Sequence, residues 1–381
     1  MKHIHLFILL SAFIFQLAAC ASPNAASNVI TNVAAATVMP SPTPTQTPLP
    51  MPRLRIDNRV QMEYRADASD LASAQNGSAF AWTRKDWDND KQFDVYSGAV
   101  FIPAYNLVEQ RPLDANHPIA IAVESKQERV VLGSAQGEIE IWNARTGMRD
   151  QVLGQVNGKP VSIALNQDET LAAVGADGYY QGGLGSVTIF DKEKNTAPIV
   201  LSAYGAVTRV RFAPNNQLYY ATNANSCGRG GGGVFAWQRG QTRAQLIFTA
   251  NGNPVRDIAV HPQGKFIASV GTNSAMRCIG TSVVSVWNTT DAKITRVFTP
   301  TNQIENEPPQ TLDAYSVAFS PDGKFLAIGD ALGRVQVWDW QAGQVLATSD
   351  MDSTQTTHIV FLTNHLLAYF TLDGYVRLFS F

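Results

Sequence analysis

A repeat unit that ends in an aromatic residue constrains this chain more than any other feature of its sequence. The aromatic recurs roughly every 40 to 50 residues, and each copy closes a short alternating apolar segment. The aromatic positions are Tyr96, Trp142, Phe190, Trp237, Trp287, Trp338 and Phe379. A glycine stands five residues earlier at Gly137, Gly185, Gly232, Gly333 and Gly374. A period of this length predicts a series of similar structural units.

The clearest unit, residues 315–339, shows how one copy is built. Two apolar segments flank a Pro-Asp-Gly-Lys turn at residues 321–324, and a third alternating segment reaches Trp338. Alternating apolar residues predict strands with one buried face. The glycine before the third strand predicts a turn residue with positive φ. The aromatic is expected to pack against the neighbouring unit, because one small sheet cannot bury its face alone.

This pattern resembles the WD-repeat propeller family over nearly all of residues 54–381. The resemblance implies an all-β fold, a seven-bladed β-propeller of four-stranded antiparallel blades. The chain departs from the family in two ways: Trp338-Asp339 is the only Trp-Asp pair that ends a unit, and the Gly-His dipeptide with its buried His-Asp-Trp network is missing. The last unit stops after its third strand, so we expect residues 54–64 to supply the missing outer strand by the closure familiar in this family.

The first 19 residues have the features of a signal peptide. An apolar run from Ile4 to Phe15 is too short to span a bilayer comfortably. Residues 17–20, Leu-Ala-Ala-Cys, resemble the bacterial lipobox, which implies a diacylglyceryl group on Cys20 and further acylation of the mature N-terminus. An ordinary signal peptide with an incidental cysteine is the alternative. Ala21, rather than Asp, favours the outer membrane facing the periplasm in a two-membrane cell, and otherwise the outer face of the cytoplasmic membrane.

Residues 20–52 are expected to be a lipidated, disordered tether, and residues 53–381 the propeller. The tether is rich in Pro, Thr and Ser, a composition that cannot bury a core and favours extended polyproline II. A spacer is the simplest interpretation. A Pro-rich docking site for a partner remains the alternative.

Three consecutive units carry long connections between their second and third strands, at residues 177–183, 223–233 and 272–281. Long loops on a rigid scaffold often carry binding function. Tyr and Arg are enriched at interface hot spots, so the candidate partner-binding residues are Tyr179, Tyr180, Arg229 and Arg277. The alternative is that the loop length is merely tolerated, with no partner.

Two of these loops each contain one cysteine, Cys227 and Cys278, and only Cys20 precedes them. An exported protein is in a compartment that permits disulfides, and the two positions are nearly equivalent in adjacent units. We therefore expect a Cys227–Cys278 disulfide. Two free thiols or a redox pair are the alternatives, although no Cys-x-x-Cys motif supports redox chemistry.

An acidic cluster at Asp86, Asp88, Asp90 and Asp94 has the spacing 1, 3, 5 and 9. Alternate carboxylates of this kind can converge on one calcium ion, and the segment resembles the calcium loops of integrin-type propellers. Lys91 departs from that motif, where a glycine is usual. A solvated hairpin tip is the alternative.

Charge and motifs exclude several classes of function. The formal net charge is -2 and no basic run is present, so we expect no nucleic-acid partner. We expect a monomeric, membrane-anchored, non-catalytic scaffold that binds a protein, with no cofactor unless calcium binds. The alternatives are a hydrolase or lyase at the central channel and a calcium or ligand sensor. Carboxylates or histidines at the channel mouth would favour the enzyme, and a channel lined by Ser, Thr and apolar residues would favour the scaffold.

Overall fold

The fold is that of a computed structural model of the chain, and all the residues that it describes belong to the unit Pro50–Phe381. The structure describes residues 67–74, 80–88, 93–101, 118–125, 129–144, 146–178, 184–223, 232–249, 254–272, 281–302, 310–351, 354–372 and 376–381. These residues form strands and turns. Within them, a search for a helix long and apolar enough to cross a membrane finds none.

The described strands form seven antiparallel sheets of three or four strands, and one two-stranded ribbon. The first four sheets contain β1 (Asp67–Ser73), β2 (Phe80–Asp88), β3 (Phe93–Phe101); β4 (Pro118–Val123), β5 (Arg129–Ser134), β6 (Glu138–Asn143), β7 (Met148–Gln155); β8 (Lys159–Leu165), β9 (Leu171–Asp177), β10 (Ser186–Asp191), β11 (Ile199–Ser202); and β12 (Ala206–Phe212), β13 (Leu218–Asn223), β14 (Gly233–Trp237), β15 (Gln245–Thr249).

The remaining sheets follow the same sequential order. They contain β16 (Val255–Val260), β17 (Phe266–Thr272), β18 (Ser282–Asn288), β19 (Ile294–Phe298); β22 (Ala314–Phe319), β23 (Phe325–Asp330), β24 (Val335–Asp339), β25 (Gln344–Thr348); and β26 (Thr356–Phe361), β27 (Leu366–Thr371), β28 (Val376–Ser380). The ribbon pairs β20 (Thr301–Asn302) with β21 (Gln310–Thr311). Many four-stranded antiparallel sheets in an all-β chain fit a β-propeller.

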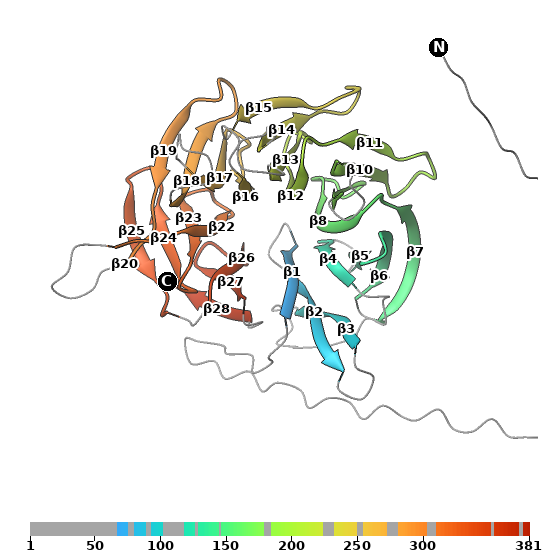
Figure 1. Cartoon of the computed structure of the whole chain (residues 1–381), viewed down its shortest axis with the longest axis horizontal. Coiled ribbons are helices and arrows are strands. Elements are labelled where there is room, and N and C mark those ends of the chain that lie inside the picture. Colours follow the sequence, from blue (N-terminus) through green and yellow to red (C-terminus); the bar gives the residue numbers. More distant parts are fainter. Residues whose placement is uncertain are drawn as a thin grey trace, which may run out of the picture. The chain divides into compact units, whose positions relative to one another are not determined.

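The first strands of successive sheets contact one another. Contacts run from β1 through β4, β8, β12, β16 and β22 to β26, and β26 also contacts β1. Figure 1 shows these seven first strands grouped around a common centre, with the later strands of each sheet farther out. The predicted closing segment, residues 54–64, lies outside the described residues. The last sheet has three described strands.

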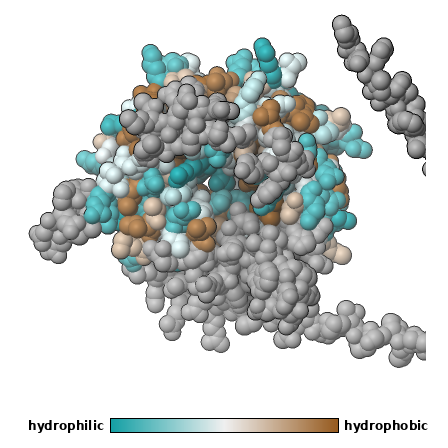
Figure 2. Space-filling view, in the orientation of Figure 1, coloured by the Kyte–Doolittle hydropathy of each residue, from teal (hydrophilic) through white to brown (hydrophobic). Residues whose placement is uncertain are grey.

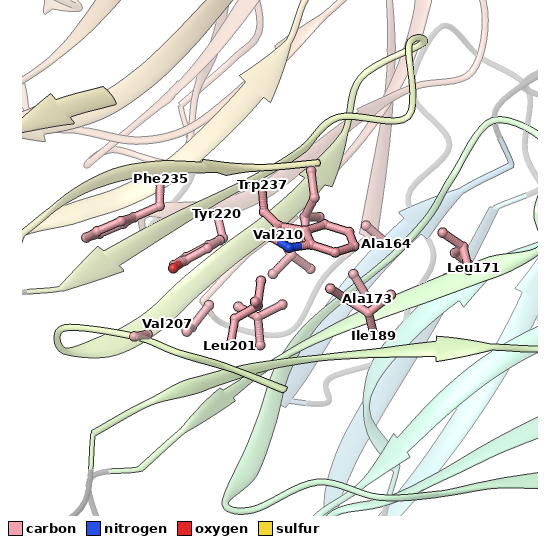
Figure 3. Close-up of a cluster of buried hydrophobic side chains, with 13 residues drawn as sticks. Ala164, Leu171, Ala173, Ile189, Leu201, Val207, Val210, Tyr220, Phe235 and Trp237 are labelled. Carbon is pink, nitrogen blue, oxygen red and sulfur yellow. The ribbon is translucent and has the colours of Figure 1, made fainter. Parts of the chain in front are cut away.

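Among the described side chains, the aromatic that ends a unit packs against the preceding sheet, as the repeat predicts. Figure 3 shows Trp237, from β14, in one cluster with Ala164 and Leu171 of the preceding sheet. Trp287 packs in the same way in a cluster with Ala213 and other residues of the sheet before it. Trp237 and Trp287 are among the largest fully buried side chains of the described residues. The core is therefore a series of inter-sheet clusters.

The glycine of the repeat serves two different purposes. Gly137 and Gly333 have φ of 91° and 74°, which confirms the predicted left-handed turn position. Gly185 is not in that conformation. A Cβ on Gly185 would lie 2.5 Å from the Gly205 carbonyl oxygen, so the close approach of two backbones requires glycine there. Gly374 lies outside the described residues.

Candidate functional site

The structure places few of the site residues expected from the sequence. Cys20, Cys227, Cys278, Tyr179, Tyr180, Arg229, Arg277 and Asp90 lie outside the described residues. The three long loops do connect second to third strands in consecutive sheets, since they follow β9, β13 and β17. The disulfide and the partner-binding residues stay predictions.

The acidic cluster lies on a β-hairpin. The backbones of Asp86 and Asp88 belong to β2, that of Asp94 belongs to β3, and Asp88 pairs with Phe93. In the described part of the chain, no three His, Cys, Asp or Glu residues are grouped as metal ligands. The calcium site stays a prediction, and calorimetric titration with millimolar calcium tests it.

A feature that sequence reasoning missed is a shared irregularity of the first strands. In each of the seven sheets, the register of the first strand shifts by one residue near its start. Such a bulge re-aims the side chain that follows it. We call the residue after each shift the bulge residue; the seven are Asp70, Ala120, Ser162, Arg209, Asp257, Ser316 and His358.

Two aspartates among the bulge residues make the same contacts in different sheets. Asp70 Oδ2 accepts the N–H of Ile121 in β4 at 3.0 Å, and Asp257 Oδ2 accepts the N–H of Val317 in β22 at 3.0 Å. The Oδ1 atom of each also accepts the N–H of its own following residue at 2.9 Å. Each aspartate thus joins its sheet to the next one.

Two serines among the bulge residues join further pairs of sheets. Ser162 Oγ accepts the N–H of Val210 in β12 at 3.3 Å. Ser316 Oγ donates to the carbonyl oxygen of Thr356 in β26 at 3.2 Å. Ala120 has no polar side-chain atom, so the β4–β8 junction lacks such a bond from its bulge residue.

Asp70, Arg209 and Asp257 form one buried network, which the half-buried His358 joins. Arg209 Nε lies 2.7 Å from Asp257 Oδ1, and Arg209 Nη1 lies 3.4 Å from Asp70 Oδ1. His358 Nε2 lies 3.3 Å from the same Asp70 oxygen. Asp70, Asp257 and Arg209 are 2%, 3% and 5% exposed. Arg209 therefore links β12 to the neighbouring β16 and also to β1, which is not its neighbour in the order of sheets.

The network lowers the pKa values of both Asp70 and His358. Burial alone would raise the pKa of Asp70, but the His358 hydrogen bond, the charge of Arg209 and the Ile121 N–H outweigh burial and lower it. Burial, followed by the charge of Arg209, lowers the pKa of His358. A neutral His358 can donate from Nε2 to Asp70 and accept from Thr357 Oγ1 at Nδ1, 3.1 Å away.

A cavity of about 460 Å³ lies beside this network. It is lined from six first strands by Asp70, Ile121, Ile163, Arg211, Val260 and Val360. Figure 2 shows hydrophilic residues gathered near the centre of the face that it draws.

The cavity and the strand ends to which the long loops attach belong to opposite edges of the sheets. The lining includes Gln167 and Pro214, which follow the ends of β8 and β12. The long loops follow the second strands, which run antiparallel to the first and so end at the other edge. The expected binding face is therefore not the face onto which the cavity opens.

The arrangement of the network favours a structural role over a reactive one. Both oxygens of Asp70 and of Asp257 accept hydrogen bonds, and both ring nitrogens of His358 have partners. Asp70 is the one carboxylate that lines the cavity among the described residues. A general acid–base pair needs a second group within reach of a substrate.

The sequence carries a signal for the bulge residues, although it is weak. Five of the seven are followed by Leu, Ile or Val and then by Ala. Alternation of this kind is common in buried strands, so it does not identify a polar network without the arrangement of the sheets.

Comparison with known proteins agrees with this architecture. Residues 285–364 match the WD40 domain family of anaphase-promoting complex subunit 4. The chain is 23% identical over 249 residues to telomerase protein component 1 of Rattus norvegicus and 22% identical over 250 residues to that of Mus musculus. Each alignment covers 65% of this chain, which spans 8% of the length of these curated relatives. The matches and the sheets together fit a WD-repeat protein with a β-propeller fold, a type of domain that generally mediates protein–protein interaction.

Proposed function

We propose that this chain is a lipid-anchored protein of the cell envelope whose seven-bladed propeller acts as a non-catalytic scaffold for a protein partner. The observation that carries the scaffold proposal is the position of the three long loops. The strand ends to which they attach are at the same edge of three consecutive sheets, β8–β11, β12–β15 and β16–β19. Adjacent loops on a rigid support make one continuous surface, which suits a partner of protein size.

The contacts of the first strands support seven blades in a closed ring. Each of the seven sheets contributes one first strand, and the contacts return from β26 to β1. The His358–Asp70 contact joins these two strands. Residues 54–64 would complete the last blade as its outer strand.

The buried network supports a scaffold over an enzyme. Its carboxylates and histidine already make the hydrogen bonds that join the sheets. The rigid ring that results would hold the loops of the opposite face in fixed relative positions.

A partner capture experiment tests the scaffold. The full chain is crosslinked in native membranes, and the captured proteins are compared with those of a variant carrying Tyr179→Ala, Tyr180→Ala, Arg229→Ala and Arg277→Ala. We expect the variant to lose a specific partner. The control is Gln263→Ala with Lys265→Ala, exposed positions in the turn that follows β16 on the opposite face. Equal capture by both variants would contradict the binding face.

The lipid anchor rests on residues 17–20 and has its own test. Metabolic labelling with palmitate should mark the wild-type chain and leave Cys20→Ser unlabelled. The labelled chain should partition into detergent. Equal labelling of both chains would exclude Cys20 as the lipidation site.

A further inference from the structure

Arg211 is an exception among seven equivalent positions of the first strands. The residue two positions after each bulge residue is Ala72, Ala122, Ala164, Arg211, Ala259, Ala318 and Val360. Six of the seven are small or apolar, as expected where seven first strands meet around a common centre. A long cation at the remaining position needs a separate explanation.

No carboxylate pairs with Arg211 among the described residues. Its one described hydrogen bond runs from Nη1 to the carbonyl oxygen of Val210 at 2.9 Å. Arg209, on the same side of β12, instead takes the two nearby carboxylates, those of Asp257 and Asp70. A guanidinium has five N–H donors, so Arg211 keeps donors for another acceptor.

The electrostatics of the site favour an added anion. Burial, followed by the charge of Arg209, lowers the pKa of Arg211 to about 10. Arg211 therefore stays charged at neutral pH, although its surroundings oppose that charge. A bound anion would offset both the burial and the repulsion from Arg209.

The cavity limits what the anion can be. Its volume of about 460 Å³ suits a small molecule. Ile121, Ile163, Val260 and Val360 contribute apolar atoms to its lining. Asp70 also lines it, so a second negative charge on the ligand would be repelled. One carboxylate on an apolar body fits better than a phosphate.

We propose that the central cavity binds a small carboxylate with an apolar body and that Arg211 holds its carboxylate through paired hydrogen bonds. The planar fork of a guanidinium matches the two oxygens of a carboxylate. The carboxylate belongs to a free acid or to the C-terminus of a peptide, which share this chemistry. The inference does not depend on the proposed protein-binding loops, which attach at the other edge of the sheets.

Calorimetric titration of the full chain tests the site. Benzoate is compared with benzamide, which has the same shape without the charge. We expect benzoate to bind at least tenfold more tightly, because the charge-assisted pair is lost with the amide. In Arg211→Gln, benzoate binding should weaken at least tenfold. The control, Arg243→Gln at an exposed position, should bind as the wild type does.

Stability separates a ligand site from a structural arginine. Without ligand, Arg211→Gln should melt at or above the wild-type temperature, since it removes an unpaired charge. If that variant does not fold, Arg211→Lys takes its place and should bind benzoate at least threefold more weakly, because an ammonium cannot make the paired bonds. No benzoate binding, or equal binding of benzoate and benzamide, would overturn the proposal. N-acetylphenylalanine, with its amide as the uncharged control, then distinguishes a peptide C-terminus from a free acid as the ligand. If N-acetylphenylalanine binds more tightly than benzoate, the site takes a chain terminus. If it binds more weakly, the site takes a free acid.

Discussion

Single residues hold the sheets of this molecule together in a way that apolar packing alone does not explain. Asp257 accepts the Val317 N–H from the next sheet and the guanidinium of Arg209 from the previous one. A buried carboxylate is stable only when its oxygens are satisfied and its charge is paired. By satisfying its own oxygens, Asp257 therefore also fixes its sheet relative to the sheets on either side.

Replacement of Asp257 by alanine should destabilise the fold strongly. The change leaves the Val317 N–H without its acceptor and leaves Arg209 with Asp70 alone. We expect a loss of about 3–5 kcal/mol in the free energy of unfolding, measured by urea denaturation. Asp291→Ala, at an exposed position, should stay within about 0.5 kcal/mol of wild type. Equal effects of the two variants would contradict the role of Asp257.

Adding Arg209→Met to Asp257→Ala should cost less than the sum of the two single changes. The double variant removes the uncompensated charge that each single variant leaves buried. Strict additivity, measured by the same denaturation, would show that the two residues do not act as a pair.

His358 should make the fold sensitive to mild acid. Burial and Arg209 lower its pKa below 6.5, the value expected for the unfolded chain. As the pH falls below about 6.5, the unfolded chain binds a proton that the folded chain does not, so the stability contribution present above that pH is lost. We expect stability to fall between pH 7 and pH 5 by up to about 1.4 kcal/mol per pH unit for this one proton.

The variant His358→Gln should show a smaller fall over the same pH range, with melting followed at each pH. His365→Gln, at an exposed position, is the matched control. Identical pH profiles for His358→Gln and the wild type would rule out His358 as the titrating group.

At the scale of the strands, close backbone approach is as important as side-chain packing. Gly185 precedes β10, and its N–H donates to the Gly205 carbonyl oxygen at 3.2 Å. An added Cβ would meet the carbonyl oxygens of Gly205 and Ala176 and the nitrogen of Val207, all closer than 3.0 Å. These are backbone atoms, which cannot move aside as a flexible side chain can.

Gly185→Ala should therefore cost about 3 kcal/mol or more in the free energy of unfolding. Gly240 provides the comparison, because it has a φ of 96° but no atom within 4 Å of an added Cβ. Gly240→Ala should cost about 1 kcal/mol from backbone strain alone. Urea denaturation measures both, and equal costs would show that the close approach at Gly185 is not limiting.

The predicted disulfide also belongs to this scale, because it would join the loops of two adjacent sheets. Cys227 follows β13 and Cys278 follows β17, and β13 contacts β16 of the second of these sheets. The chain-entropy relation assigns about 4 kcal/mol to a loop of this length. Labelling of native, unreduced protein should find no free thiol at either position, whereas two reactive thiols would exclude the bridge.

The sequence allowed the strands to be predicted better than the contacts between sheets. The aromatic of each unit was expected to pack against its neighbour, and Trp237 and Trp287 do so, because one periodic pattern determines both strand and burial. The bulge residues could not be found in this way. They belong to seven separate segments, and their contacts depend on how the sheets are arranged around the centre. Arg211 illustrates the difference: its exceptional position is apparent only after the seven strands are aligned.

For the whole molecule, the decisive question is how the ring is completed. β28 pairs with β27, and in the described residues no further strand covers its outer edge. The other complete sheets have a fourth strand there, such as β25 beside β24. An unpaired edge exposes a row of N–H and carbonyl groups. Residues 54–64 would cover that edge. They would thereby join the segment before the first sheet to the last sheet, so that the stability of the whole ring depends on this one strand.

Deletion of residues 54–64 should lower the melting temperature of the full chain by about 5 °C or more, because the last sheet loses a strand and the ring loses its closure. The matched control deletes residues 40–50, a segment of equal length in the Pro-rich tether, and should leave the melting temperature unchanged. Differential scanning calorimetry measures both deletions. If both chains melt at the wild-type temperature, residues 54–64 do not complete the last blade. If only the first deletion destabilises, the segment before β1 is part of the propeller and the tether ends before it.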